Sequence, residues 1–147
     1  MSSHTDPDWR PKAILFDLLT ALLDSWTTWT AAVEAVTSNP ETSSDHARSW
    51  RERYLQLTYE CGAYIPYESL VTRAAIDVGL PGQVTTQLVE RWEELKAWPE
   101  VEGVLEKLRE KGYKLGVVTN CSKELGEKAL KRVGVEFDCW VSAEEAG

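Results

Sequence analysis

This chain has no paired cysteine pattern, fewer basic than acidic residues and no long apolar run, and each of these features argues against a class of protein. Its three cysteines, Cys61, Cys121 and Cys139, lack the paired spacing of a disulfide framework or a zinc site, so we expect no bound metal and a reducing compartment, the cytoplasm. Lys and Arg number 16 against 24 Asp and Glu. The net charge of −8 argues against nucleic acid or an anionic membrane as a partner. No apolar run is long enough for a membrane span.

Hydrophobic residues make up 43% of the 147 positions, which is enough for one ordinary domain with its own core. Residues 1–12 are polar and carry no signal-peptide pattern, so we expect a flexible tail there. Apolar periodicity in the rest of the chain predicts strands near residues 13–16, 114–119 and 137–141, and helices near 22–37, 44–61, 67–78, 84–98, 99–111 and 123–133.

This order of elements is typical of an α/β fold with an insertion. We predict a Rossmann-like parallel sheet formed by residues 13–20 and 99–147. Residues 21–98 show helical periodicity and no strand pattern, so we expect them to form an inserted, all-helical cap. The small-molecule substrate of such a protein would bind between the sheet and the cap.

Polar groups follow the ends of two predicted strands. Asp17 comes directly after the apolar residues 13–16, which we interpret as a buried strand, and Thr119 and Asn120 close the strand at 114–119. Because the carboxyl ends of parallel strands share one crevice, we expect these groups to lie together. Asp17 is then a candidate nucleophile or acid/base group, and the alternative is an Asp that only caps the next helix.

Three segments resemble the haloacid dehalogenase-like hydrolase superfamily, and within it the 2-haloacid dehalogenase branch. The sequence Phe-Asp-Leu-Leu-Thr-Ala-Leu-Leu-Asp at residues 16–24 resembles the first motif of that branch, Phe-Asp-x-Tyr-Gly-Thr-Leu. Residues 98–101 and 113–120 resemble its second motif and the helix leading into it. Residues 49–54, Ser-Trp-Arg-Glu-Arg-Tyr, are similar to the cap segment that carries a substrate-binding Arg.

The resemblance implies a hydrolase without a cofactor, in which Asp17 displaces halide from the α-carbon of a 2-haloacid and water hydrolyses the resulting ester. It implies that Arg51 clamps a carboxylate or the leaving halide, and that Trp50 or Tyr54 keeps the cleft dry. A helix starting near Ser122 would favour an anion beside the site. The substrate-binding residues implied are Thr20, Trp50, Arg51, Tyr54, Thr119 and Asn120.

The departures from the family pattern are also informative. Leu19 stands where phosphatases of the superfamily carry a second Asp, so we expect no magnesium-dependent phosphoryl transfer. The sequence ends at Gly147, before the family's Lys and acidic C-terminal motifs, and we expect a truncated enzyme with impaired or altered hydrolysis. The first strand would then be an open apolar edge, which predicts a homodimer or larger homo-oligomer.

Two alternatives to dehalogenation stay open at this point. In the first, the fold serves a biosynthetic isomerase, cyclase or lyase, and Asp17 is a general acid/base acting on an apolar substrate in a desolvated pocket. In the second, the chain is a non-catalytic remnant that acts through its oligomer interface.

Overall fold

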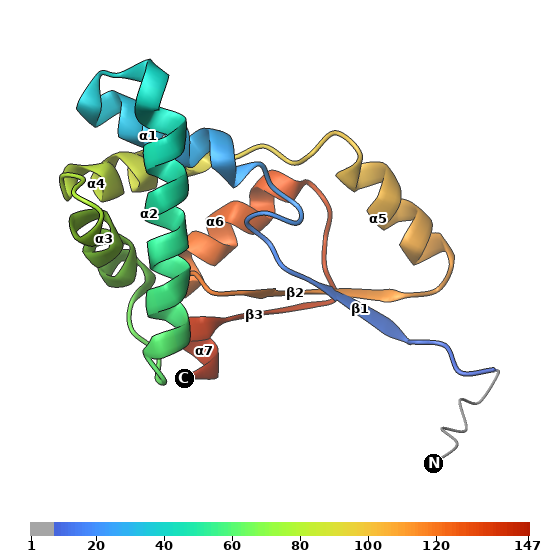
Figure 1. The fold of residues 1–147 in the computed structure, drawn as a ribbon. Helices are drawn as coiled ribbons and strands as arrows, with labels where there is room; N and C mark the ends of the chain where they lie inside the picture. The colour runs from blue at the N-terminus through green and yellow to red at the C-terminus, as the bar shows by residue number, and fades with distance from the viewer. Residues whose placement is uncertain (1–7) are drawn as a thin grey trace, which may run out of the picture.

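A computed structural model describes residues 8–147 and contains one sheet of three parallel strands (Figure 1). Strand β2 (Lys114–Thr119) lies between β1 (Ala13–Phe16) and β3 (Cys139–Ser142). The predicted α/β fold with a parallel sheet is therefore confirmed. Of the tail predicted for residues 1–12, residues 1–7 lie outside the described part of the chain.

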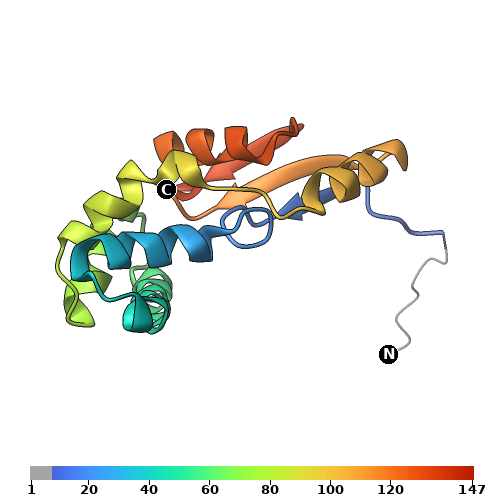
Figure 2. The same ribbon diagram turned by 90° about the horizontal axis from the view of Figure 1, so that it is seen from above.

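One face of the sheet is covered by helices and the other is not. Helices α5 (Val101–Glu110) and α6 (Lys123–Val133) lie over the face to which Leu115 and Val117 point, and both of these side chains are buried (Figures 1 and 2). On the opposite face Leu15, Val118 and Val141 are 61%, 50% and 40% exposed. We refer to this second surface, formed by Leu15, Val118 and Val141, as the bare face.

Strand β1 is not the buried strand that its apolar sequence predicts. None of its residues is fully buried, and exposure alternates along it. In the described structure β1 pairs with β2 alone, so it forms an edge of the sheet. Apolar composition predicts a strand correctly here but cannot tell a central strand from an edge strand that has one uncovered face.

Four helices stand beside the carboxyl ends of the strands and pack around aromatic side chains (Figure 1). Trp29, Trp50, Tyr67 and Trp92 are almost completely buried. The ring centroids of Trp29 and Trp50 lie 4.3 Å apart, and those of Tyr67 and Trp92 lie 5.9 Å apart. The helices are α1 (Ser25–Thr37), α2 (Pro40–Glu60), α3 (Tyr67–Asp77) and α4 (Gln83–Glu90), followed by the 3-10 turn η1 (Trp92–Glu94).

Two helix predictions were wrong by at least four residues at one end. Helix α2 begins at Pro40 rather than near residue 44, because Pro is well suited to the first turn of a helix. Helix α4 ends at Glu90 instead of near residue 98. Residues 96–98 are extended and lie against residues 22–24: the Asp24 N–H donates to the Lys96 carbonyl at 2.8 Å, and the Trp98 N–H donates to the Leu22 carbonyl at 3.1 Å. We refer to these two segments as the linker crossing.

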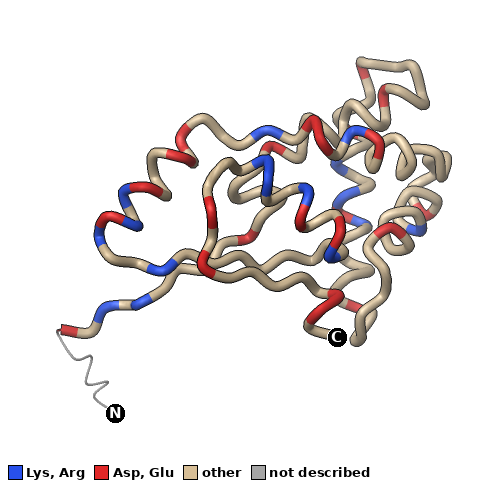
Figure 3. The backbone as a smooth tube through the Cα atoms, turned by 180° about the vertical axis from the view of Figure 1, so that it is seen from behind, with Lys and Arg blue, Asp and Glu red and all other residues tan. Residues whose placement is uncertain are grey.

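The charged residues are not spread evenly over the molecule (Figure 3). Four basic residues line a groove at the amino ends of β1 and β2, which is the end of the sheet opposite Asp17; they are Arg10, Lys12, Lys111 and Lys114. Within residues 8–147, no helix has the length and apolar character needed to cross a membrane.

Candidate active site

Asp17 follows β1 directly, at the carboxyl end of the sheet. Its side chain is exposed, and Thr20 holds one of its carboxylate oxygens. The Thr20 hydroxyl donates to Asp17 Oδ2 at 3.0 Å, and the Thr20 backbone N–H approaches the same oxygen at 3.4 Å. This turn fixes the direction of the carboxylate while leaving Asp17 Oδ1 available to a substrate.

Asp17 lies in a cavity of about 330 Å³ between the end of the sheet and helices α1 and α2. Six of the seven residues predicted for the site line this cavity: Asp17, Thr20, Arg51, Tyr54, Thr119 and Asn120. Its size is that of a site for a small molecule. The folded chain therefore brings together residues that are distant in sequence but that the strand-end and cap motifs place in one site.

Arg51 supplies the positive charge of this cavity. Its Nη1 donates to Ser25 Oγ at 2.6 Å, and its guanidinium carbon lies 4.6 Å from the ring centroid of Trp26 and 5.4 Å from that of Trp29. The residue is only 8% exposed. Burial lowers the pKa of Arg51, while the nearby Tyr67, Tyr54 and Asp17 oppose that effect.

Arg51 and Asp17 face the same cavity, but they do not form an ion pair with each other. The ion pairs among the described residues involve other side chains. Ser25 and the two indole rings hold the guanidinium in place instead. A space is therefore left between a carboxylate and a fixed cation, and an anionic or polarisable group can enter it.

Thr119 and Asn120 reach the cavity from the end of β2, but they differ in what they can offer. Thr119 is buried, and its hydroxyl lies 3.2 Å from the Cys121 sulfur. Asn120 is exposed at the cavity wall. Burial raises the pKa of the Cys121 thiol to about 11, so this thiol stays protonated at neutral pH and is a poor nucleophile.

Trp50 is the predicted site residue that the structure places elsewhere. It is fully buried in the helical block, and its Nε1 donates to the Val71 carbonyl at 2.8 Å. The reason is the 3.6-residue period of a helix, which turns Trp50 into the core while its neighbour Arg51 faces the cavity.

The amino terminus of α6 does not offer a free anion site. Ser122 caps the helix by accepting from the Leu125 N–H at 3.4 Å, and its hydroxyl donates to Glu68 of α3 at 3.2 Å. The Lys123 N–H donates to a Glu144 carboxylate oxygen at 2.6 Å. A carboxylate of the chain itself thus occupies the position where the helix was expected to favour a bound anion.

Sequence reasoning missed five residues that also line the cavity: Leu19, Trp26, Glu52, Leu55 and Tyr59. Three of these belong to α2 together with Arg51. Residues 51, 55 and 59 follow one another at four-residue steps, which places them on one face of the helix. That spacing, counted from Arg51, was the signal in the sequence that could have identified Leu55 and Tyr59.

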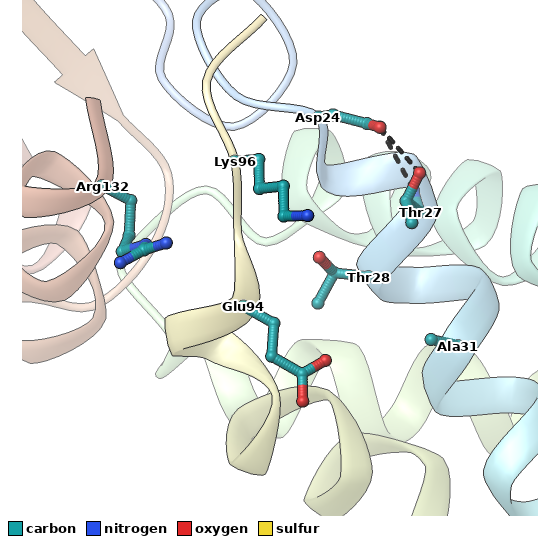
Figure 4. A pocket seen from close by; sticks show the side chains of 7 residues that line it. All are labelled: Asp24, Thr27, Thr28, Ala31, Glu94, Lys96 and Arg132. Carbon is teal, nitrogen blue, oxygen red and sulfur yellow. Dashed lines mark hydrogen bonds between the residues drawn. The ribbon is translucent and has the colours of Figure 1, made fainter. Parts of the chain in front are cut away.

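A second cavity, of about 370 Å³, lies beside the start of α1 (Figure 4). It contains an Asp–Thr contact similar to the one between Asp17 and Thr20. Asp24 there accepts two hydrogen bonds from Thr27, one from the backbone N–H at 3.2 Å and one from the hydroxyl at 2.6 Å. Asp24 is the N-cap of α1, and it lines this second cavity rather than the one that contains Asp17.

Comparison with known proteins places the chain among dehalogenase-like folds. Residues 14–146 match the family model of haloacid dehalogenase-like hydrolases. The chain is 27% identical over 146 residues to haloacetate dehalogenase H-2 of Moraxella sp. (strain B), covering 92% of this chain and 64% of that protein.

Two solved structures share the fold. A dehalogenase solved as an intermediate complex superposes with a TM-score of 0.75 at 23% identity, over 92% of this chain and 64% of that one. The L-2-haloacid dehalogenase of Xanthobacter autotrophicus, solved with chloropropionic acid covalently bound, gives 0.73 at 19% identity, over 90% and 57%. The chain thus spans less than two thirds of the length of each of these relatives.

Proposed function

Because this chain belongs to the haloacid dehalogenase-like hydrolase family, we propose that it acts in the hydrolytic removal of halide from small 2-haloacids, with Asp17 as the nucleophile. The observation that carries the proposal is the placement of the Asp17 carboxylate, held by Thr20, opposite the buried Arg51 in one cavity. A carboxylate that shares a cavity with a fixed cation is suited to attack a carbon whose leaving group is an anion.

In the first step Asp17 Oδ1 attacks C2 of the substrate from the side opposite the carbon–halogen bond. The new C–O bond forms as the halide departs with the bonding electrons, which leaves an ester between Asp17 and the 2-carbon. Arg51 offsets negative charge on the halide or on the substrate carboxylate, and Asn120 donates to whichever of these lies nearer β2. Leu19, Leu55 and Tyr54 contribute the apolar wall around the alkyl group.

In the second step water adds to the ester carbonyl. The acyl C–O bond breaks, and a 2-hydroxyacid, a proton and the Asp17 carboxylate result. The covalently bound chloropropionic acid in the Xanthobacter autotrophicus structure is consistent with an ester of this kind. Leu19 presents no second carboxylate beside Asp17, in keeping with carbon–halogen rather than phosphoryl chemistry.

The acid/base alternative requires a desolvated, unpartnered carboxylate. Asp17 is instead exposed and accepts a hydrogen bond from the Thr20 hydroxyl. We therefore favour the nucleophilic role.

The test is halide release from 2-chloropropionate, together with isotope labelling that reports whether an ester of Asp17 forms. Turnover in ¹⁸O-labelled water should place the label in the Asp17 carboxylate after a single cycle, as read by peptide mass spectrometry, because water attacks the acyl carbon. Label found only in the 2-hydroxyacid after a single cycle would mean that water attacks C2 directly, and it would exclude Asp17 as the nucleophile.

We also propose that two copies associate through the bare face and the β1 edge. An apolar surface next to an unpaired strand edge favours pairing with another chain. In sedimentation experiments Val118→Lys should dissociate the dimer, whereas Val104→Lys should not, because Val104 is similarly exposed at 48% but lies on α5. A wild-type monomer at micromolar concentration would refute the association.

We make three further proposals from the sequence. Residues 21–98 would act as the cap over Asp17, with residues 13–20 and 99–147 as the core. The net charge of −8 disfavours nucleic acid as a partner. The free thiols of Cys61, Cys121 and Cys139 fit the cytoplasm.

A further inference from the structure

Trp98 makes an unusual connection between the linker crossing and the loop that contains Asp17. Its indole Nε1 donates to the Thr20 carbonyl at 2.9 Å, across 78 residues of sequence. Its backbone N–H donates to the Leu22 carbonyl at 3.1 Å, so that both N–H groups of Trp98 hold the same short loop. Trp98 is half-buried and does not line the Asp17 cavity.

Thr20 is the residue through which this connection reaches the carboxylate. Its hydroxyl and N–H face Asp17 Oδ2, while its carbonyl accepts from Trp98. The indole therefore fixes the peptide group on one side of Thr20, and Thr20 fixes the carboxylate on the other. The rest of the loop is closed locally, because the N–H groups of Leu22 and Leu23 both donate to the Leu18 carbonyl.

We propose that Trp98 is a positioning residue for the nucleophile, acting through Thr20 and the linker crossing. Displacement at carbon requires the attacking oxygen to be aligned with the leaving group, and small errors in that alignment are costly. Loss of the indole N–H leaves the Thr20 carbonyl without this partner and releases the main chain at Thr20. A shift of that main chain displaces the hydroxyl that holds Asp17. This inference rests on the proposed dehalogenase function.

The experiment compares variants in the full chain by steady-state halide release from 2-chloropropionate. Trp98→Phe should lower kcat about tenfold with little change in KM, since alignment of the nucleophile changes and the substrate contacts do not. Replacement of Trp98 by β-(3-benzothienyl)alanine keeps the ring shape and removes the donor, and it should give the same loss. The matched control is Trp92→Phe, which removes an equivalent bond from Trp92 Nε1 to the Leu125 carbonyl at 2.8 Å, away from Asp17.

A second readout does not depend on turnover. In ¹⁵N-edited NMR spectra the Thr20 amide should shift in both Trp98 variants and stay in place in Trp92→Phe. Wild-type kcat in the benzothienyl variant would overturn the positioning role, as would an unmoved Thr20 amide. Failure of the proposed function looks different: the wild-type protein would then release no halide, while the Thr20 amide would still report on the connection.

Discussion

Asp17 and Asp24 make similar contacts with a nearby threonine and differ in what surrounds them. Each is followed three residues later by a Thr whose backbone N–H and hydroxyl point at its carboxylate. Asp24 caps α1 and satisfies the first turn of that helix. Asp17 caps no helix, because it follows β1 directly and faces a cavity that Arg51 also lines. Both Thr20 donors approach one oxygen of Asp17, whereas the two Thr27 donors use both oxygens of Asp24. A similar Asp–Thr contact is thus structural at one position and leaves a carboxylate oxygen open to the cavity at the other.

The largest expected contrast comes from removing each charge while keeping the shape. Asp17→Asn should reduce halide release by at least about 10³-fold, because an amide is a very weak nucleophile. Asp24→Asn should leave activity nearly unchanged, since Asn is also a good helix cap. Both are measured by halide release from 2-chloropropionate, and equal losses in the two variants would end the distinction between the two aspartates.

A second contrast tests the cation that separates the two environments. Arg51→Lys should lower kcat/KM about 10²-fold, because an ammonium group cannot keep both the bond to Ser25 and the stacking on Trp26 while facing the cavity. Arg53→Lys on the same helix is the control: Arg53 pairs with Asp77 at 2.8 Å outside the cavity and should tolerate the change. A wild-type kcat/KM in Arg51→Lys would show that the cavity needs no guanidinium.

The two threonines give the third contrast. Thr20→Val removes the hydroxyl that orients Asp17 and should lower kcat about tenfold with a small change in stability. Thr27→Val removes the corresponding hydroxyl at Asp24 and should cost about 1 kcal/mol in the free energy of unfolding while activity is kept. Kinetics and urea titration of both variants measure the two effects. We expect Thr20→Val to lose mainly activity and Thr27→Val to lose mainly stability.

The smallest expected effect concerns stability alone. Asp24→Ala should lower the free energy of unfolding by about 1 kcal/mol, the usual cost of losing an N-cap. Asp17→Ala should cost less, because no helix depends on Asp17. Urea titrations compare the two, and a larger loss in Asp17→Ala would indicate that Asp17 is the structural member of the pair.

Local signals in the sequence predicted the sheet end of the site well. Strand β2 and helix α6 have the bounds expected from the sequence, because an apolar run, the cap Ser122 and the left-handed Gly134 mark them within a few residues. Asp17, Thr119 and Asn120 meet since the carboxyl ends of parallel strands lie together.

What the sequence could not predict depends on distant contacts. Residues 96–98 continue the helical periodicity of α4, yet they pair with residues 22–24, and a periodicity count does not reveal such a partner. The bare face depends on long-range packing in the same way, whereas the edge position of β1 agrees with what the family resemblance led us to expect. Trp50 and Arg51 are neighbours in sequence, and only the packing of α2 decides which of them faces the cavity.

The bond between Trp98 and Thr20 also bears on when the loop that contains Asp17 is held during synthesis. Asp17 leaves the ribosome early, but the residue that fixes its loop follows 78 positions after Thr20. Until the linker crossing closes, Asp17 belongs to a segment that Trp98 does not yet hold, and the four helices must be made first. Asp17, the proposed nucleophile, is therefore made early, and ribosome-bound chains that stop short of Trp98 lack the long-range contact that holds its loop.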